Sequence, residues 1–576
     1  MKTIPEIFFQ TAEKFSQKPA LLTKESGVYF SYTFEQVAKK VKIFSQTLLG
    51  LGIQKGEKVA ILSENRPEWA IADLGIMSIG AITVPLHTTF NPKAISNVLN
   101  HSEAKAVVVA STDLLLKILL FQKELPFLEK IIYVEKLNDD LKKVSDKKIL
   151  NWDDLVAQAE FKDFVPKNLN SEDVCTIIYT SGTTGNPKGV MLSHRNLLEN
   201  VEAVKRAVPI KTSDLFLSFL PLSHVLERLA GYYVPLLTGA SIAYAENIKK
   251  LSQNLKETKP TILISVPRIF EKFYDVIQDK IASSSVFKQN LFHWALKRKS
   301  SGFSHWLADH LIFKKIRNQL GGRLRLTVSG GASLNKKIAK FFLKIGILIL
   351  EGYGLTETSP VISVNQENDF KFGTVGKTLD NIKVKISPEK EILIQGPSLM
   401  KGYYKDLTET QKAINKDNWF HTGDLGFIDQ EGFLTVIGRK KEMLVTSGGK
   451  NIWPEVIEKE INHDPYVSQS MVIGHNRKFI SALIVPDWGE VKNFLKAKNL
   501  LVKAPEELVK SPEMLDLFRE RIELINRNFS HFEDIVRFKL IVDEFSQERE
   551  ELTPTLKLRR QLIEKHYQQA IEEMYY

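Results

Sequence analysis

A dense group of hydroxyl residues, glycines and one lysine follows an apolar stretch of the chain. The segment reads Tyr179-Thr-Ser-Gly-Thr-Thr-Gly-Asn-Pro-Lys-Gly-Val190. Glycines let backbone N–H groups turn towards a phosphate, and the hydroxyls and the lysine add donors and positive charge. Pro187 stands where a Walker loop has glycine, so this is not a Walker loop. The segment predicts a phosphate-binding loop that uses Ser181, Gly182, Thr183, Thr184, Gly185 and Lys188.

Four further motifs follow the loop along the chain. They are Gly352-Tyr-Gly-Leu-Thr-Glu-Thr358, His421-Thr-Gly-Asp424, Gly438-Arg-Lys-Lys-Glu442 and Pro554-Thr-Leu-Lys-Leu-Arg559. With the loop, and in this order, they resemble the motifs of the adenylate-forming enzymes, which include acyl-CoA synthetases, luciferases and peptide-synthetase adenylation domains. Five ordered matches are far more specific than any one of them, and the resemblance covers essentially the whole chain.

Other segments narrow the resemblance to long-chain acyl-CoA synthetases. They are Leu220-Pro-Leu-Ser-His-Val-Leu-Glu-Arg228, Val266-Pro-Arg-Ile-Phe-Glu-Lys272, Gly330-Gly-Ala-Ser333 and the Thr-Pro-Thr-Leu-Lys557 version of the last motif. The resemblance implies an AMP-forming long-chain fatty acid–CoA ligase that uses a fatty acid, ATP, Mg²⁺ and CoA. An acyl–acyl carrier protein synthetase is the alternative, because a net charge of +11 suits an acidic carrier protein as well as CoA.

The reaction explains the residue types in these motifs. A carboxylate does not react with a thiol at neutral pH, because its leaving group is poor. Attack of the carboxylate on the α-phosphate of ATP releases pyrophosphate and gives an acyl-adenylate, which is a good acyl donor. The protein mainly positions the reactants and stabilises charge.

For the large domain, the resemblance assigns the following roles. Thr184 and Glu357 are the expected Mg²⁺ ligands, since Mg²⁺ prefers a carboxylate, a hydroxyl, phosphates and waters. Lys188 should hold the β- and γ-phosphates. His224 is either a neighbour of the carboxylate or phosphate, or a satisfied core residue. The nucleotide pocket is expected to use Gly331, Ala332, Gly352, Tyr353, Gly354 and Thr356, with Tyr353 stacking on the base.

For the end of the chain, the resemblance implies two functional surfaces. Asp424 should accept hydrogen bonds from the ribose hydroxyls, with Arg439 beside it. Lys557 should reach the α-phosphate and the carboxylate during adenylation. The glycines and the lysine of Ser447-Gly448-Gly449-Lys450 should face the site later and guide the pantetheine thiol. Both surfaces can serve one pocket only if the domain rotates, and Lys441 is the expected pivot.

The elements that must position these residues predict an α/β fold. Apolar strands are expected at 58–63, 104–110, 174–180, 261–266 and 324–329, with an amphipathic helix at 67–79. From residue 382 the pattern changes to period two, typical of half-buried strands at 382–386 and 391–394. We expect a large domain of layered, mostly parallel α/β subdomains with a β-rich part (1–438), and a small mobile α+β domain (439–576).

Composition agrees with a globular protein with anionic partners. The 576 residues are 43% hydrophobic and 26% charged, which excludes disordered, collagen-like and disulfide-rich chains. The single cysteine, Cys175, excludes an intrachain disulfide and is expected to be a buried core thiol. No run approaches the ~20 apolar residues of a spanning helix. We expect a cytoplasmic protein, or one that binds a membrane peripherally.

Residues 287–325 form a distinctive basic segment. Nine lysines and arginines stand against Asp309 alone, with phenylalanines and tryptophans interleaved. The segment predicts either a surface that contacts an anionic membrane or an ordinary helix pair with a solvated basic face. It forms no nucleic-acid-binding motif, so we expect no nucleic-acid partner. A serine hydrolase is also excluded, because no Gly-x-Ser-x-Gly elbow occurs.

Overall fold

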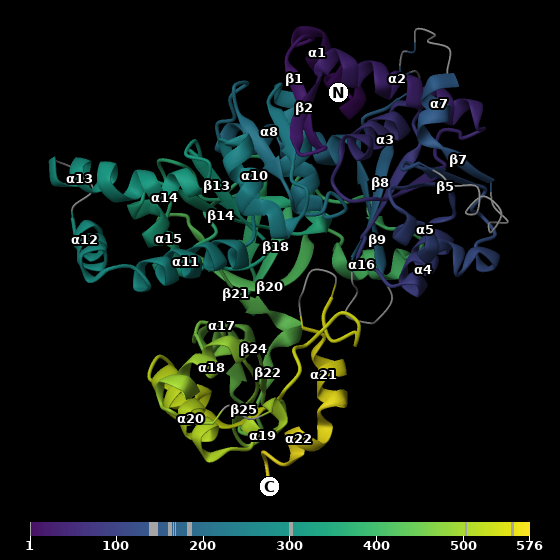
Figure 1. Ribbon diagram of the computed structural model, residues 1–576. Helices are drawn as coiled ribbons and strands as arrows, with labels where there is room; N and C mark the ends of the chain where they lie inside the picture. Colours follow the sequence, from purple (N-terminus) through teal and green to yellow (C-terminus); the bar gives the residue numbers. More distant parts are fainter. Residues whose placement is uncertain are drawn as a thin grey trace. The chain divides into compact units, whose positions relative to one another are not determined.

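A computed structural model describes residues 2–136, 148–158, 164, 166, 169–180, 187–298, 303–501, 504–553 and 558–576 (Figure 1). The chain forms two compact units. The first consists of Met1–Lys385, Leu393–Thr422 and Ile428–Thr435, and the second of Ile386–Ile392, Gly423–Phe427 and Val436–Tyr576.

An eight-stranded sheet in the first unit carries the strand that leads into the predicted phosphate loop. Its strand order is β19 (Gly402–Tyr403), β9 (Lys188–Ser193), β8 (Val174–Thr180), β4 (Ile82–Leu86), β3 (Lys58–Leu62), β5 (Ala104–Val109), β6 (Lys130–Tyr133) and β7 (Lys148–Asn151). Neighbouring strands from β8 to β7 are parallel, whereas β9 is antiparallel to both β8 and β19. The central strands are apolar and buried, as covered parallel strands usually are.

A nine-stranded sheet forms the second layer of the first unit. Its strand order is β16 (Lys377–Thr378), β15 (Val361–Val364), β14 (Ile349–Gly354), β13 (Leu326–Ser329), β12 (Ile262–Ser265), β10 (Leu215–Ser218), β11 (Ser241–Tyr244), β1 (Pro19–Glu25) and β2 (Val28–Thr33). The strands from β14 to β1 are parallel, and the edge strands are antiparallel. The predicted α/β fold with mostly parallel sheets is therefore confirmed.

Helices cover both sheets of the first unit (Figure 1). They are α1 (Ile4–Lys14), α2 (Phe34–Gly50), α3 (Pro67–Ser78), α4 (Pro92–Ser102), α5 (Thr112–Leu119), α7 (Trp152–Gln158), α8 (His194–Ala207), α9 (Val234–Thr238), α10 (Leu251–Thr258), α11 (Pro267–Ala282), α12 (Val286–Leu296), α13 (Phe303–Ala308), α14 (Lys314–Gln319), α15 (Lys336–Lys344) and α16 (Leu407–Ala413). The prediction that 67–79 is amphipathic is wrong. Every residue of α3 except Glu68 is buried, because the helix packs against α1 and α2 and against β1, β3 and β4.

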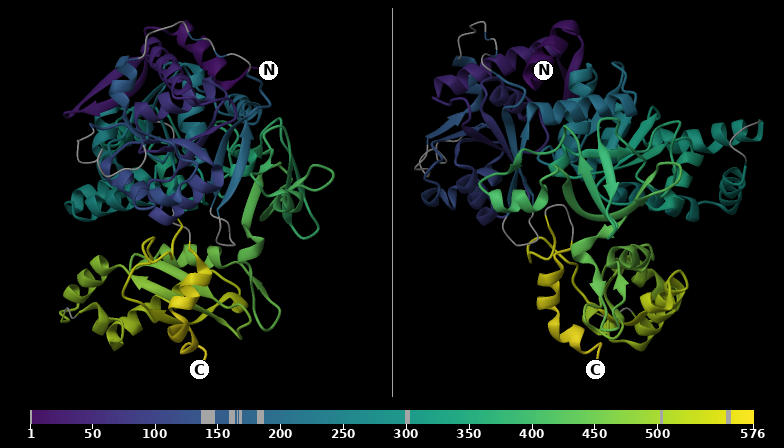
Figure 2. Two further views of the ribbon diagram at one scale, coloured as in Figure 1. Left: turned by 90° about the vertical axis from the view of Figure 1, so that its right-hand side faces the viewer. Right: turned by 180° about the vertical axis from the view of Figure 1, so that it is seen from behind.

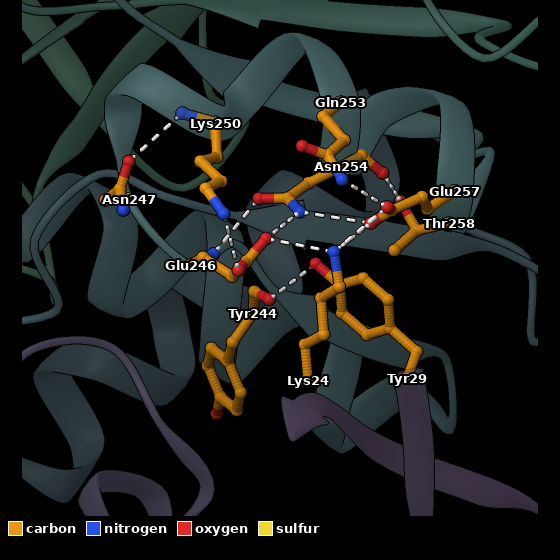
Figure 3. A network of polar contacts seen from close by, with 10 residues as sticks. All are labelled: Lys24, Tyr29, Tyr244, Glu246, Asn247, Lys250, Gln253, Asn254, Glu257 and Thr258. Atoms are coloured by element: carbon orange, nitrogen blue, oxygen red, sulfur yellow. Dashed lines mark hydrogen bonds and ion pairs between the residues drawn. The ribbon is translucent and has the colours of Figure 1, made fainter. Parts of the chain in front are cut away.

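A buried lysine joins the hairpin β1–β2 to the neighbouring strand and helix (Figure 3). The Lys24 ammonium donates to Glu246 Oε2 at 3.1 Å and to Glu257 Oε2 at 2.8 Å, and its side chain is only 4% exposed. Tyr29 adds a hydroxyl bond to the carbonyl of Tyr244 at 3.0 Å. This network attaches the N-terminal hairpin to β11 and α10, near one edge of the nine-stranded sheet.

A four-stranded sheet contains the β-rich part that the period-two pattern predicted. Its strand order is β17 (Lys383–Ile386), β18 (Glu391–Gln395), β20 (Phe420–Ile428) and β21 (Leu434–Arg439). β17 alternates in exposure as expected, but the expected half-buried alternation in 391–394 is wrong. These four residues are all buried, so both faces of β18 are covered and not one alone. Its one acid, Glu391, accepts a hydrogen bond from the Gly423 N–H at 3.1 Å.

The second unit is built on a three-stranded sheet in the order β24 (Val467–Ile473), β25 (Ile480–Pro486) and β26 (Ile535–Leu540). Alternate side chains of β24 and β25 enter two separate cores. One core includes α17 (Pro454–Asn462), α18 (Trp488–Ala497), α19 (Pro505–Leu508) and α20 (Pro512–Asn526), and the other α21 (Arg560–His566) and α22 (Gln568–Glu572). Helices therefore cover both faces of this sheet, which is the expected α+β arrangement (Figure 2).

Two features predicted from composition can be checked in the described part of the chain. Cys175 lies in β8 and is 1% exposed, which confirms a buried thiol. Burial raises the pKa of this thiol far above its ordinary range. Among the described residues, no helix combines the length and the apolar character that crossing a bilayer requires.

Candidate active site

The hairpin β8–β9 carries the predicted phosphate loop. Residues Thr180 and Lys188 are paired in the antiparallel register, so the two ends of the loop lie side by side. Lys188 begins β9 and is half-buried. The other predicted loop residues lie outside the described residues: Ser181, Gly182, Thr183, Thr184 and Gly185.

Tyr403 brings the predicted lysine and the predicted metal ligand into one cluster. β19 pairs with β9, with Tyr403 opposite Val190. The Tyr403 hydroxyl donates a hydrogen bond to Glu357 Oε1 at 2.9 Å. The Lys188 ammonium lies 5.2 Å from the centre of the Tyr403 ring, within the range of a cation–π contact. Burial and the neighbouring Glu357 raise the pKa of Tyr403, so its hydroxyl stays protonated and remains a donor.

An acid on α16 pairs with the same lysine. The Lys188 ammonium forms an ion pair with the Glu409 carboxylate, which also contacts Lys412. These two lysines lower the pKa of Glu409 to about 2, so it is ionised throughout the neutral range. A triphosphate that binds Lys188 therefore competes with a carboxylate that already neutralises it.

Tyr403 and Glu409 were not predicted from the sequence. Glu409 is 221 residues from Lys188 in the chain, and no local spacing links the two. The only available signal is the turn chemistry around Asp406, which caps α16 by accepting from the Glu409 N–H at 3.0 Å. That signal predicts a helix start but no partner for the phosphate loop.

The predicted nucleotide pocket lies at two adjacent strand ends. Ser329 of β13 is paired with Glu351 of β14 in parallel register, so the segments that follow both strands emerge at one edge of the sheet. The Leu334 N–H donates to Glu351 Oε2 at 3.0 Å and ties the two segments together. The structure therefore brings together two groups of predicted residues: Gly331 and Ala332 after β13, and Gly352, Tyr353 and Gly354 in β14 followed by Thr356.

At two of these positions, the backbone conformation or the close packing of the chain requires glycine. Gly331 has φ of +83°, a conformation that other residues adopt with strain. At Gly354 an added Cβ would lie 1.8 Å from the Pro360 carbonyl oxygen. Glycine at 354 therefore allows β14 to pass close to Pro360 just before the turn η5 (Thr356–Thr358), which carries Glu357.

The segment that contains His224 ends in a π-helical stretch, η2 (Glu227–Tyr233). His224 is half-buried, and its Nδ1 accepts from the Leu226 N–H at 3.3 Å. This contact shows a partnered histidine and leaves its role near a substrate as a prediction. Glu227 is fully buried, and a contact with the Ser218 side chain only partly offsets the effect of burial on its carboxyl group. Burial raises the pKa of Glu227 to about 8, so at neutral pH the carboxyl group is mainly protonated.

Arg228 connects this segment to the strand that leads into the phosphate loop. Its buried guanidinium pairs with Asp73 of α3 and donates to the Thr176 hydroxyl of β8 at 2.7 Å. It also donates to the Tyr233 hydroxyl at 3.0 Å. A buried ion pair needs this kind of additional hydrogen bonding to offset its desolvation. Arg228 therefore fixes η2 against both α3 and β8.

In the second unit, Asp424 and Arg439 are partners. Asp424 in β20 is 4% exposed, and its Oδ1 lies 3.2 Å from Arg439 Nε at the end of β21. The expectation that Arg439 sits beside Asp424 is thus met in geometry, while the ribose role of Asp424 stays a prediction. The next residue, Lys440, pairs with Glu389 and Glu391.

The other described residues that were predicted in the second unit lie at exposed turns. Lys441 is exposed in η6 (Lys440–Glu442), directly after β21. Gly448, Gly449 and Lys450 lie in the exposed turn between β22 (Leu444–Val445) and β23 (Asn451–Ile452). Lys557 lies outside the described residues, but Leu552 and Leu558 on either side of its segment form a bridge.

Glu357 fits the predicted magnesium site in its chemistry. Mg²⁺ in nucleotide sites is usually held by one or two carboxylates together with phosphates and waters. Glu357 supplies such a carboxylate, held by Tyr403, beside the lysine of the phosphate loop. The described residues contain no group of three or more His, Cys, Asp or Glu side chains that could hold a metal without a nucleotide.

Two protein-family models match the chain. The model of the AMP-binding enzymes matches residues 8–404, and the model of their C-terminal domain matches residues 441–576. The chain therefore belongs to the family of AMP-binding enzymes. The activity that goes with this family is adenylation of a carboxylic acid with ATP.

Individual relatives are similar over almost the full length. The chain is 33% identical to the long-chain-fatty-acid–CoA ligase FadD15 of Mycobacterium bovis, over 95% of this chain and 93% of that protein. It is 29% identical to the long-chain-fatty-acid–[acyl-carrier-protein] ligase AEE15 of Arabidopsis thaliana, over 100% of this chain and 87% of that protein. Among solved structures, the adenylation domain of a carboxylate reductase from Mycobacterium chelonae superposes with a TM-score of 0.82 at 20% identity, over 100% and 91% of the two chains. This last likeness supports the fold alone.

Proposed function

We propose that the protein is an AMP-forming long-chain fatty acid–CoA ligase. The cluster of Lys188, Glu357 and Tyr403 is the observation that carries the proposal, because it joins a phosphate-binding lysine to a carboxylate suited to Mg²⁺. Similarity to long-chain fatty acid–CoA ligases supports the choice of substrate and acceptor.

In the first half-reaction, a carboxylate oxygen of the fatty acid attacks the α-phosphorus of ATP. The bond from this phosphorus to the bridging oxygen breaks, and pyrophosphate leaves with the electron pair. Lys188 leaves Glu409 and binds the departing phosphates, while Tyr403 holds Glu357 in place. Mg²⁺, bound through Glu357 and Thr184, would neutralise charge on the triphosphate. Lys557 stabilises the charge that develops at the α-phosphate and the carboxylate.

In the second half-reaction, the thiol of CoA loses its proton to solvent and its sulfur attacks the acyl carbonyl carbon. The bond from this carbon to the phosphate oxygen breaks, and AMP leaves. Gly448, Gly449 and Lys450 guide the pantetheine arm after residues 439–576 have rotated about Lys441. The small domain of residues 439–576 therefore presents two surfaces in turn to the large domain of residues 1–438.

An acyl carrier protein is the second candidate acceptor. The similarity to an acyl carrier protein ligase over the whole chain favours it, as does the basic net charge of +11. The fatty acid would still be activated as the adenylate, and only the thiol of the second half-reaction would differ.

A paired assay tests this proposal. Pyrophosphate release is measured over a series of fatty acid chain lengths, and thioester formation is measured with CoA and with a phosphopantetheinylated acyl carrier protein in competition. We expect long-chain acids to give pyrophosphate and CoA to take the acyl group. Lys188→Met is the negative control, and loss of a donor of this kind typically costs ~10²–10³ in rate. Preference for the carrier protein would replace the first candidate by the second, and no pyrophosphate release with any fatty acid would overturn both.

A further inference from the structure

We propose that a basic and aromatic surface on α12, α13 and α14 docks the protein onto a membrane that contains anionic lipids. The surface, called the basic–aromatic arm, consists of residues 286–298 and 303–319. Its helices lie at one edge of the first unit, at the left in Figure 1. This proposal goes beyond the proposed function, and its test measures binding and does not require catalysis.

The arm is a folded structure with a defined inner face. Phe292 and Ala295 of α12, Ala308 of α13 and Phe313 of η4 (Asp309–Phe313) belong to one buried core with β12 and α15. Positions 292 and 295 of α12 are three residues apart and so point to the same side of the helix. The faces of α12 and α13 that carry no core residue therefore point towards the outside of the unit.

The outer faces expose large apolar side chains at helical spacing. Phe303 is 77% exposed, Trp306 is 52% exposed, and the two rings stack with centroids 5.7 Å apart. On α12, Phe287 is 75% exposed and Val286 is also exposed. Exposed phenylalanine and tryptophan side chains are unfavourable in water, and a cluster of them marks an interaction site. At a bilayer such side chains enter the boundary between head groups and acyl chains.

The outer faces also carry exposed lysines that have no acidic partner among the residues the structure describes. Phe303, Trp306, His310 and Lys314 follow one another at three- and four-residue spacing and are all exposed. The structure records no ion pair for the arm's exposed lysines within the described residues. These lysines are Lys288, Lys297, Lys314 and Lys315.

Some of the basic side chains counted in the sequence are not available to a partner, because they form ion pairs within the protein. Arg317 pairs with Asp309 at 2.5 Å, and Arg325 pairs with Asp214 at 2.5 Å, so neither is available to a partner. Lys299 lies outside the described residues. The cationic face therefore consists of the four exposed lysines and the half-buried Arg298, whose guanidinium lies 4.9 Å from the centre of the Trp294 ring. Unpaired cations beside exposed aromatic rings match a bilayer surface, which is anionic at the head groups and apolar beneath them.

Vesicle binding tests the arm. The protein is sedimented with vesicles of phosphatidylcholine alone and with vesicles that contain about one third phosphatidylglycerol. Each lysine near an anionic surface contributes about fivefold to binding, so the variant K288E/K297E/K314E/K315E should lose at least ~10²-fold in partition coefficient. A second variant, F287S/F303S/W306S, should lose binding that persists at high salt, where charge is screened.

The matched control reverses four exposed lysines outside the arm, as K249E/K256E/K383E/K416E. It changes net charge equally and should retain vesicle binding. Thermal unfolding and pyrophosphate release with detergent-dispersed fatty acid should stay at the wild-type level in all variants, which separates docking from folding and from catalysis. Equal vesicle binding by the K288E/K297E/K314E/K315E variant and the wild type would overturn the proposal. It would also be overturned if both arm variants abolished a concentration-dependent dimer while leaving vesicle binding unchanged.

Discussion

At the scale of single residues, the two side chains proposed to bind the triphosphate and Mg²⁺ already contact other protein side chains. Lys188 pairs with Glu409, and Glu357 accepts from Tyr403. These two contacts differ in what they do for the reaction. In the proposed reaction the Glu409 contact must break when a triphosphate binds, whereas the Tyr403 contact holds the proposed metal-binding carboxylate in place.

Glu409→Gln should therefore strengthen ATP binding. A partly exposed ion pair of this kind is worth about 0–1 kcal/mol, so the dissociation constant for ATP should fall by up to about fivefold. Lys188→Met should weaken ATP binding, because it removes the cation itself. Equilibrium binding of ATP to the two variants measures both effects. An increase of the dissociation constant in Glu409→Gln would contradict competition between Glu409 and the triphosphate.

Tyr403→Phe should raise the Mg²⁺ concentration needed for half-maximal pyrophosphate release. The variant keeps the ring beside Lys188 but removes the hydroxyl that donates to Glu357 at 2.9 Å. Loss of one hydrogen bond to a charged group costs about 1.5–3 kcal/mol, so we expect a shift of roughly tenfold or more. Turnover at saturating Mg²⁺ should recover. A loss of turnover with an unchanged Mg²⁺ requirement would show that the hydroxyl does not position a metal ligand.

Glu227 makes stability depend on pH. The pKa of its carboxyl group is 4.5 in the unfolded chain and about 8 in the folded protein. Because the folded-state pKa is raised, its contribution to stability is complete below pH 4.5 and is lost as the pH rises to about 8. The amide of Glu227→Gln does not ionise in this pH range. The free energy of unfolding of the variant should therefore rise relative to that of wild type as the pH increases from 4.5 to about 8, by at most about 4–5 kcal/mol.

Thermal unfolding of Glu227→Gln and wild type between pH 4.5 and pH 8 measures this difference. The exposed Glu367→Gln is the matched control, and its curve should run parallel to that of wild type. If the Glu227→Gln curve also ran parallel, the carboxyl group would be ionised to the same extent in both states.

At the scale of elements, one arginine holds three of them together. Arg228 joins η2 to α3 through Asp73 and to β8 through Thr176. Arg228→Met leaves the Asp73 carboxylate buried without its cation, which should destabilise the protein by about 3–5 kcal/mol. The double variant R228M/D73L removes the stranded charge and should recover most of that loss. Thermal unfolding of both variants measures the recovery. Equal destabilisation of R228M and R228M/D73L would show that the unpaired charge of Asp73 is not the source of the lost stability.

The sequence predicts elements where the pattern is local. The strands β3, β5 and β8 were predicted to within about one residue, because continuous apolar runs are typical of covered parallel strands. The predicted amphipathic character of α3 and the half-burial of β18 were wrong, since both depend on neighbours from distant parts of the chain. The partners Tyr403 and Glu409 were missed for the same reason.

At the scale of the whole molecule, the family follows from motifs that lie far apart but in a fixed order. Matches over residues 8–404 and 441–576 agree with that order. The geometry of the site could be predicted only in part. Adjacent parallel strands place Gly331 and Tyr353 at one sheet edge, which α/β folds use for ligands. The ion pair of Lys188 depends on Glu409 of α16, a helix that no motif includes.

Alternation of two domains predicts opposite defects in two variants. Lys557→Ala should lose pyrophosphate release by ~10²-fold or more, yet convert supplied acyl-adenylate and CoA to thioester at a near-normal rate. Lys441→Pro should keep pyrophosphate release and lose thioester formation, because proline fixes φ near −65° at the pivot. Both half-reactions are measured on each folded variant. Equal loss of both steps in both variants would contradict alternation.

The burial of Cys175 has a practical consequence for measuring the proposed rotation. The only cysteine of the chain is 1% exposed, and its thiol is held in the unreactive protonated form. Maleimide dyes should therefore leave the native protein unlabelled. Two cysteines introduced at exposed sites, one at Lys416 and one at Glu548, would be the only reactive thiols. A donor and an acceptor fluorophore at these sites would report the separation of the two units in single molecules during turnover, with no background mutation to remove a native thiol.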